Sequence, residues 1–161
     1  MTQEDKKLLL KDLSARLTYG VKAYVKNWSK LDRKYYEGVY TVDSIHPSLN
    51  TVLTCSDKFC VEVILGYDDY EIKPYLFPLS SMTDELWDKE FRGYGITEFT
   101  RDSFKYGCET LEFNNSNPDL LNMVKFINQL IKNHFDIYGL IEKGLAIDAT
   151  NLDIYYDEED F

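Results

Sequence analysis

The longest apolar pattern in the sequence runs from residue 117 to residue 135 and has the period of an α-helix. Asn117 can cap its first turn, Pro118 suits the first helical position, and Asp119 complements the positive end of the helix dipole. The apolar arc covers roughly two thirds of the helical wheel, so this helix is expected to be covered on more than one side. The centre of the arc is formed by Leu120, Val124, Ile127 and Ile131, flanked by Leu121, Met123, Phe126, Leu130 and Phe135.

A second helix is predicted at the N-terminus. Thr2 and Asp5 have the spacing of a capping pair, in which each side chain accepts the other residue's backbone N–H. The leucines at positions 9, 10, 13 and 17 form a stripe about 100° wide, which is typical of a surface helix. This helix should end near Gly20 and pack one face on the core.

From Val21 onward the period changes to two, which indicates a half-buried strand. Val21, Ala23 and Val25 share one face of it, and Lys22, Tyr24 and Lys26 share the other. Residues 27–32 are expected to turn the chain. Further strands are predicted at 36–45, 51–55 and 59–65, the last two as a hairpin across residues 56–58. Their connections are short, so an antiparallel meander is the simplest arrangement.

The second half of the chain is less regular. Pro74 and Pro78 force residues 71–79 to run extended, over the surface or along a sheet edge. Thr83 should cap a short helix over 84–91, and short strands are expected at 96–100 and 110–113. A helical turn at 138–144 and a strand at 145–147 follow. The prediction is an α+β fold: a small, twisted antiparallel sheet, curled or barrel-like, packed by the 117–135 helix and flanked by the N-terminal helix.

Composition places this fold in one intracellular domain. The chain has 161 residues, with 13 Tyr and 9 Phe, enough aromatic surface to exclude a disordered protein. It has no apolar run of the ~20 residues needed to span a bilayer and no signal-peptide pattern, so we expect a cytoplasmic protein. One domain is predicted over residues 1–152, followed by an acidic, aromatic tail at 153–161.

The three cysteines are expected to be reduced and free of metal. Cys55, Cys60 and Cys108 are odd in number and lack the paired spacing of a zinc site. No cofactor is predicted either, because Gly93 and Gly95 are not followed by the third glycine and the lysine of a phosphate-binding loop.

Charge is distributed unevenly along the chain. The net charge is −10, yet residues 1–34 carry nine Lys or Arg against four Asp or Glu. The acidic remainder argues against general affinity for nucleic acid. One basic and aromatic face remains a candidate for binding single-stranded nucleic acid, although lysines also protect exposed sheet faces from aggregation, and we favour that role. This face consists of Lys22, Tyr24, Lys26, Trp28 and Lys30.

His134 is the candidate centre of a small enzyme. It follows the long helix, where an imidazolium would be favoured by the dipole. Catalysis would also need a carboxylate or nucleophile nearby, and Asp136 is the nearest acid in sequence. The structural interpretation, in which His134 bonds a carbonyl at the helix end, is preferred.

Three groups of residues stand out along the chain: Asp12-Leu13, Ala15-Arg16-Leu17 and Tyr19-Gly20-Val21-Lys22; then Ile72-Lys73-Pro74-Tyr75-Leu76 and Pro78-Leu79-Ser80-Ser81-Met82-Thr83; then His134-Phe135-Asp136 and Gly139-Leu140-Ile141-Glu142-Lys143-Gly144-Leu145-Ala146. Together they resemble an uncharacterised family of short proteins encoded by gut anaerobic bacteria and their phages or prophages. The resemblance implies a bacterial, cytoplasmic or mobile-element setting. It implies no activity, so no catalytic residue can be transferred from the family.

The end of the chain carries the most function-like pattern. Its aromatic ring and acids suit a protein partner whose pocket has a basic rim. It is loosely similar to the acidic tails of bacterial single-stranded-DNA-binding proteins, but it lacks their linker and their proline. The alternatives are a solvated tail or pairing of residues 154–156 with a sheet edge. The residues concerned are Asp157, Glu158, Glu159, Asp160 and Phe161.

Together these patterns favour a non-catalytic interaction or accessory protein. A small acidic chain rich in tyrosine offers adhesive aromatic surface and little organised chemistry. Single-strand binding through the basic face and catalysis at His134 are the two alternatives. The pattern identifies neither a substrate nor an oligomeric state.

Overall fold

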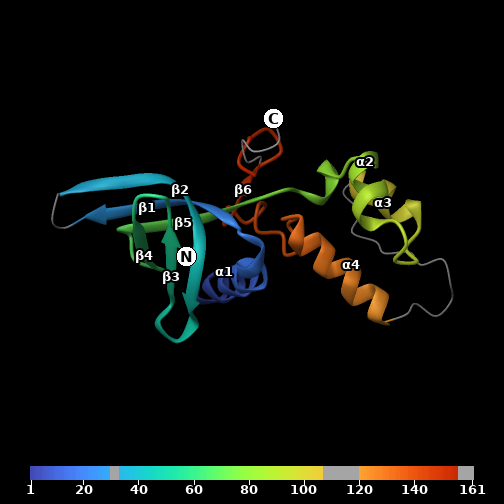
Figure 1. The fold of residues 1–161 in the computed structure, drawn as a ribbon. Helices are drawn as coiled ribbons and strands as arrows, with labels where there is room; N and C mark the ends of the chain where they lie inside the picture. The colour runs from blue at the N-terminus through green and yellow to red at the C-terminus, as the bar shows by residue number, and fades with distance from the viewer. Residues whose placement is uncertain (30–32, 107–119, 156–161) are drawn as a thin grey trace. The chain divides into compact units, whose positions relative to one another are not determined.

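The computed structural model describes residues 1–29, 33–106 and 120–155, shown as the coloured ribbon in Figure 1. The chain divides into two compact units. Unit 1 comprises Met1–Leu76 and Tyr138–Phe161, and unit 2 comprises Phe77–Ile137. One domain was expected over residues 1–152; each unit has a hydrophobic core of its own. Unit 2 is therefore an insertion in the chain of unit 1.

The described residues of unit 1 form a six-stranded sheet in the order β4-β3-β2-β1-β5-β6. All neighbouring strands pair antiparallel except β5 and β6, which are parallel. The first four strands form the predicted meander, and the α+β class is confirmed. The strands are β1 (Lys22–Ser29), β2 (Lys34–His46), β3 (Thr51–Cys55), β4 (Cys60–Ile64), β5 (Tyr70–Leu76) and β6 (Ile147–Asp148).

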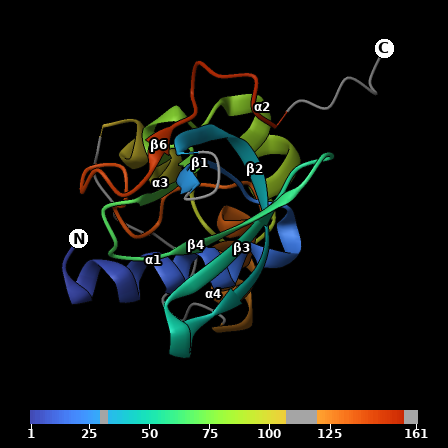
Figure 2. The same ribbon diagram turned by 90° about the vertical axis from the view of Figure 1, so that its left-hand side faces the viewer.

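The sheet is curled but not closed. The register between β2 and β3 shifts between Val42 and Ser44, and such an irregularity bends a strand and increases its twist. The bend brings β4 into contact with both β1 and β5, although β4 is hydrogen-bonded to β3. Figure 2 shows the curved strands with α1 (Gln3–Arg16) running along their lower side.

Helix α1 begins as the sequence predicts. The Thr2 hydroxyl accepts the Asp5 backbone N–H, and the Asp5 carboxylate accepts the Thr2 N–H, so the capping box is confirmed. These bonds hold the pKa of Asp5 below its usual value. Leu9 and Leu13 are fully buried in a core that also contains the inward-facing valines of the sheet.

A buried ion pair on α1 was not predicted. Asp12 and Arg16 are both 0% exposed, and they are one helical turn apart. Arg16 Nη2 donates to Asp12 Oδ1 at 2.8 Å and Nε donates to Oδ2 at 2.9 Å. This bidentate geometry offsets the cost of removing both charges from water. Charged residues on an apolar helical face are ordinarily assigned to solvent, so the sequence pattern gave no sign of this pair.

The end of the described chain packs against the sheet of unit 1. The Ala149 N–H donates to the Leu76 carbonyl at 2.8 Å. The Tyr155 hydroxyl donates to the Tyr75 carbonyl at 2.7 Å and accepts the Lys22 N–H at 3.2 Å. Burial raises the pKa of this phenol. Tyr155 thus joins the start of β1 to the end of β5, which favours the packed alternative for residues 154 and 155.

The regular elements described in unit 2 are helices, and one isolated parallel bridge joins Phe77 to Phe135. Thr83 caps α2 (Asp84–Leu86) by accepting the Leu86 N–H, as predicted, and a π-helical turn (Trp87–Phe91) continues it. The strand predicted at 96–100 is wrong, because α3 (Glu98–Lys105) occupies that region. Thr100 and Phe104 lie four residues apart and are both buried, which is the spacing of a helical face. The strand predicted at 110–113 lies outside the described residues.

Helix α4 (Leu120–Lys132) buries one flank of the predicted arc together with Ile131 from its predicted centre, whereas the N-terminal part of that centre, Leu120 and Val124, is exposed. Phe126 is 0% exposed and Leu130 2%, whereas Leu120 is 72% and Val124 48% exposed. Phe126 packs edge-on against both Trp87 and Phe91 in the core of unit 2. The expected arc was so wide that the helical wheel could not locate its centre. α4 therefore belongs to this aromatic core, whereas the sheet is packed by α1; the expected cap at 117–119 lies outside the described residues.

Unfolding measurements can test this face of α4. We expect Phe126→Ala to destabilise the protein by about 3–5 kcal/mol, because it removes buried surface and leaves a cavity. Val124→Ala should cost under about 1 kcal/mol, since that side chain is half exposed. Denaturant titrations of the two variants measure the difference. Equal losses would contradict the assignment of the buried face.

The prediction of three reduced cysteines is wrong for the β3–β4 hairpin. Cys55 and Cys60 are cross-strand partners and form a disulfide. The Ser56 N–H donates to the Phe59 carbonyl at 3.0 Å and closes the turn between them, so both Cβ atoms lie on one side of the hairpin. The spacing of two cysteines does not reveal which strand register will pair them. Cys108 lies outside the described residues.

The disulfide has a measurable effect on stability. Its cysteines are five residues apart, and a loop this short predicts a stabilisation of about 2 kcal/mol. The double variant Cys55→Ser/Cys60→Ser should unfold at lower denaturant by this amount. A reducing agent should lower the midpoint of the native protein but leave that of the variant unchanged. Rapid labelling of both thiols in the unreduced native protein would contradict the pairing.

Candidate functional site

The two faces of strand β1 provide the candidate sites of unit 1. Val21, Ala23 and Val25 are buried on the inner face, as predicted. The strand does not turn at Asn27 but continues to Ser29, with β2 on one side and β5 on the other. Trp28 consequently joins Lys22, Tyr24 and Lys26 on the outer face, and Lys30 lies outside the described residues.

On the outer face, aromatic rings and charges are already in contact with one another. Trp28 is the cross-strand partner of Tyr35, and their ring centroids are 4.8 Å apart. Lys26 Nζ lies 4.6 Å from the centroid of the Tyr35 ring. The Tyr24 hydroxyl donates to Glu37 Oε2 at 2.8 Å. We call Tyr24, Lys26, Trp28 and Tyr35 the outer aromatic cluster.

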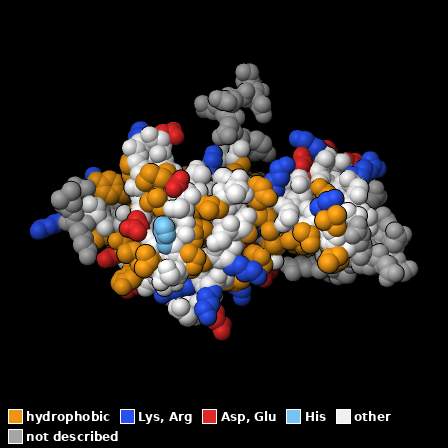
Figure 3. Space-filling model, turned by 60° about the horizontal axis from the view of Figure 1, so that its bottom comes forward, with side chains coloured by type: hydrophobic (Ala, Val, Ile, Leu, Met, Phe, Trp, Pro, Cys, Tyr) orange, Lys and Arg blue, Asp and Glu red, His pale blue; other side chains and the backbone are white. Residues whose placement is uncertain are grey.

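Acidic residues lie among the lysines of this face. Glu37 is the cross-strand partner of Lys26 on β2, and Glu71 is its partner on β5. Glu71 also forms an ion pair with Lys73 at 2.9 Å. On the face drawn in Figure 3, Lys and Arg side chains lie in small groups, several with Asp or Glu beside them, and form no continuous stripe. Because Glu37 and Glu71 lie beside Lys26, and Lys73 is paired with Glu71, the outer face has mixed charge rather than the clustered positive charge that a phosphate backbone requires.

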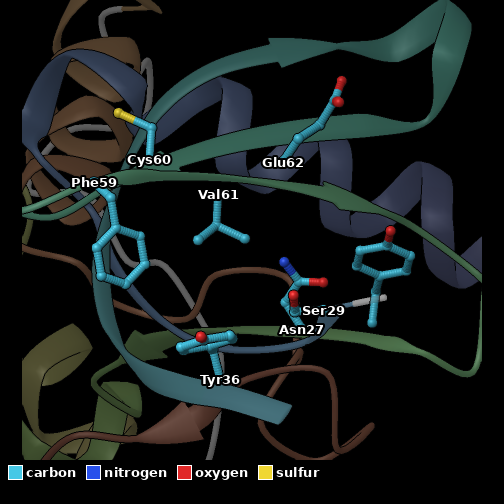
Figure 4. Close-up of a pocket in the computed structure, with 8 residues that line it drawn as sticks. Asn27, Ser29, Tyr36, Phe59, Cys60, Val61 and Glu62 are labelled. Carbon is cyan, nitrogen blue, oxygen red and sulfur yellow. The ribbon is translucent and has the colours of Figure 1, made fainter. Parts of the chain in front are cut away.

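The inner face of the sheet contains a pocket of about 530 Å³. It lies where the curl brings β4 toward β1 and β5, beyond the buried valines of β1. Figure 4 shows Phe59, Val61, Tyr36 and Asn27 converging on this space, while the side chains of Cys60 and Glu62 point to the other side of β4. The complete lining is Asn27, Ser29, Tyr36, Phe59, Cys60, Val61, Glu62 and Tyr70.

The two aromatic rings of one pocket wall, Phe59 and Tyr36, contact each other, and Tyr40 supports Phe59 from behind. Gly38 has no side chain, and a Cβ built there would lie 3.4 Å from the Tyr40 ring. The Tyr40 ring therefore lies beside Gly38, and Phe59 packs edge-on against it with centroids 5.9 Å apart. Phe59 makes a similar contact with Tyr36 at 6.4 Å. Phe59 is 47% exposed, so its ring has a free face.

Asn27 is the most unusual residue of the pocket. Its cross-strand partners are Tyr36 on β2 and Tyr70 on β5, so the three side chains form a row across the sheet. Asn27 Oδ1 is buried, and no described residue donates a hydrogen bond to it. An unsatisfied buried acceptor costs about 1–3 kcal/mol. Such an atom is informative, because buried polar groups nearly always have a partner.

His134 is buried rather than placed in a solvent-reachable pocket. Its side chain is 8% exposed and Asp136 is 6% exposed. His134 follows α4 in the left-handed region, with φ at 58°, and its carbonyl accepts the Phe77 N–H at 2.9 Å. The Asp136 N–H donates back to the Phe77 carbonyl at 2.8 Å. These bonds join the two ends of unit 2 and support a structural role for this segment.

The other candidate residues do not assemble into a site. Among the described residues, no group of three or more His, Cys, Asp or Glu side chains is placed to hold a metal ion. The acidic tail residues Asp157, Glu158, Glu159, Asp160 and Phe161 lie outside the described residues. No helix in the described part of the chain is long and apolar enough to cross a membrane.

Comparisons with known proteins leave the function to be argued from this geometry. No protein-family model, curated protein sequence or solved structure matches the chain.

The pocket did not follow from the sequence because the predicted first strand ended at Lys26. Asn27 is a common turn residue, and a turn at 27–32 would have removed it from the sheet. The alternation from Val21 to Ser29 was the signal that could have placed Asn27 on the inner face. Phe59 was missed because no local pattern reports the curl that brings β4 toward β1.

The titration of Tyr24 can test the outer face. Partial burial, followed by the hydrogen bond and charge of Glu37, raises the pKa of Tyr24 from 10.0 to about 12. The fold favours the neutral phenol, so the stability from this group is full below pH 10.0 and is lost as the pH rises toward about 12. The tyrosinate absorbance of the native protein minus that of Tyr24→Phe should show the raised midpoint.

Two charge variants separate the causes of this shift. Glu37→Gln should lower the pKa of Tyr24 toward its ordinary value, because the negative charge beside the phenol is lost. Glu62→Gln removes a carboxylate from β4 and should leave the midpoint unchanged. An ordinary pKa for Tyr24 in the native protein would mean that the hydrogen bond to Glu37 does not form in solution.

Proposed function

We propose that the chain is a non-catalytic interaction or accessory protein that binds a protein partner through the outer face of β1, β2 and β5. The observation that carries the proposal is the outer aromatic cluster, in which the Tyr35 ring contacts both Trp28 and Lys26. The sequence segments described above further support a bacterial, cytoplasmic setting of phage or mobile-element origin.

The outer aromatic cluster has the properties of an interface hot spot. Tyr35 is 49% exposed and the neighbouring Val39 is 43% exposed, so apolar surface remains for a partner to cover. Trp and Tyr are enriched among the residues that dominate binding energy. The contacts among Trp28, Tyr35 and Lys26 already restrict these side chains, which lowers the entropy lost when a partner binds.

The mixed charge of the outer face favours a protein over a nucleic acid. Glu37 and Glu71 lie beside Lys26, and Lys73 is paired with Glu71. A rim with both signs can be matched by complementary charges on a folded partner. A phosphate backbone would gain from the lysines but would be repelled by the carboxylates. Single-strand binding through Lys22, Tyr24, Lys26, Trp28 and Lys30 is therefore the second candidate.

The acidic tail is proposed as a second partner-binding segment, and its amino-acid composition is the support for this role. Four consecutive acids before Phe161 suit a partner whose pocket has a basic rim. The tail is acidic, whereas the outer face is aromatic and of mixed charge. The two surfaces therefore suit different partners and can bind independently.

Capture and crosslinking from bacterial lysate tests the outer face. A protein captured by the native chain should be lost, by about tenfold or more, when Trp28→Ala or Tyr35→Ala removes a ring of the outer aromatic cluster. Tyr67→Ala is the matched control, since Tyr67 is 64% exposed in the turn after β4 and lies outside the cluster. The comparison is made by quantitative mass spectrometry of the captured proteins.

Two outcomes would contradict the proposal. Equal capture by the native chain and the Trp28→Ala variant would remove the outer face from the interface. Capture that depends on nucleic acid, falls steeply with salt and disappears in Lys22→Glu/Lys26→Glu would establish the second candidate instead.

A further inference from the structure

We propose that the pocket on the inner face of the curled sheet binds a small, uncharged aromatic molecule that carries an N–H donor. This site is separate from the outer face, because neighbouring residues of a strand point to opposite sides of the sheet. Asn27 and Ser29 line the pocket, whereas Lys26 and Trp28 face outward. The two proposals can therefore fail independently.

The pocket has the dimensions and position of a ligand site. Its volume of about 530 Å³ lies inside the ~300–1,000 Å³ range of small-molecule pockets. Its lining residues come from β1, β2, β4 and β5 and from the turn that precedes β4. The curl makes the inner face of the sheet concave. Small molecules bind in a similar position in many β-barrels, at the open end of the barrel. The pocket is thus built by the fold rather than by one loop.

The walls select an aromatic ligand. Phe59 and Tyr36 already make edge-to-face contacts with aromatic neighbours, and Val61 forms the apolar wall between the strands (Figure 4). Tyr70, the partner of Asn27 on β5, lines the pocket on the other side of Asn27 from Tyr36. A planar ring placed in this space can stack on one aromatic side chain and meet another at its edge. Half of the Phe59 surface remains available for such a contact.

Asn27 selects the polar group of the ligand. Its buried Oδ1 accepts no hydrogen bond from any described residue, so a turn of the amide that brings Oδ1 to the pocket surface would let a bound N–H satisfy it. Glu62 is the charged residue of the described lining, and its carboxylate points away from the space. No charge on the lining therefore compensates for the desolvation of an ionic ligand.

A pair of probes of equal shape tests the proposal. Indole carries a ring N–H, and benzofuran has an oxygen in its place. Both are titrated into the isotope-labelled full chain and followed by two-dimensional NMR. Indole should shift the backbone amides of Asn27, Tyr36 and Val61. Benzofuran should bind at least about tenfold more weakly, because a site built around a hydrogen bond rejects an analogue that lacks the donor.

Variants assign the selectivity to single residues. Asn27→Leu keeps a side chain of similar size but removes the acceptor, so indole and benzofuran should bind it equally. Asn27→Ala provides the same comparison if the leucine does not fit, and the spectra themselves report whether each variant is folded. Phe59→Ala should weaken both probes by a similar factor. Tyr106→Ala is the control, because Tyr106 is 85% exposed in unit 2.

The results decide the proposal in either direction. Shifts confined to pocket residues, with a preference for indole that disappears in Asn27→Leu, establish the site and its polar contact. An absence of pocket shifts at millimolar indole overturns the proposal. Equal binding of the two probes to the native chain, or a preference that survives loss of the Asn27 acceptor, overturns it as well.

Discussion

The pairing of β1 on both of its edges is the constraint on which the described sheet depends. Each residue from Ala23 to Asn27 has a cross-strand partner on β2 and another on β5. A slip of one residue would exchange the two faces, so the burial of Val21, Ala23 and Val25 fixes the register. The same alternation exposes the outer aromatic cluster and places Asn27 in the pocket. One strand therefore determines both candidate binding surfaces.

Features encoded by neighbouring residues could be predicted from the sequence. The caps at Thr2 and Thr83, the strand faces that begin at Val21 and the β3–β4 hairpin each depend on contacts within a few residues. Asn27 shows where this local reasoning ends. Its preference for turns is weak compared with the two ladders that hold it in the sheet, because tertiary pairing overrides intrinsic propensity. Local alternation was enough to place Lys22, Tyr24 and Lys26 on one face of the strand. It could not show that tertiary pairing would keep Asn27 in the sheet, so the pocket was not predicted.

The remaining features depend on contacts between distant parts of the chain. Phe126 is buried because Trp87 and Phe91 lie beside it, and nothing within α4 distinguishes its face from that of Val124. The buried Asp12–Arg16 pair exists because the fold covers that side of α1. The Cys55–Cys60 disulfide is close in sequence, but it depends on which register the two strands of the hairpin adopt. Each case needs the position of a second element, which periodicity does not supply.

The insertion of unit 2 imposes an order on folding during synthesis. Unit 2 is one continuous segment, Phe77–Ile137, and its core draws only on that segment. The core of unit 1 includes Leu140, Leu145 and Ala146, and the end of β5, at Tyr75 and Leu76, gains its second strand partner only when Ile147 and Asp148 arrive. Strands β1 to β5 are synthesised before unit 2, but β6, which completes the sheet, is synthesised after it. An unpaired edge is prone to wrong associations, so the interval between β5 and β6 is when the nascent chain is most exposed to aggregation.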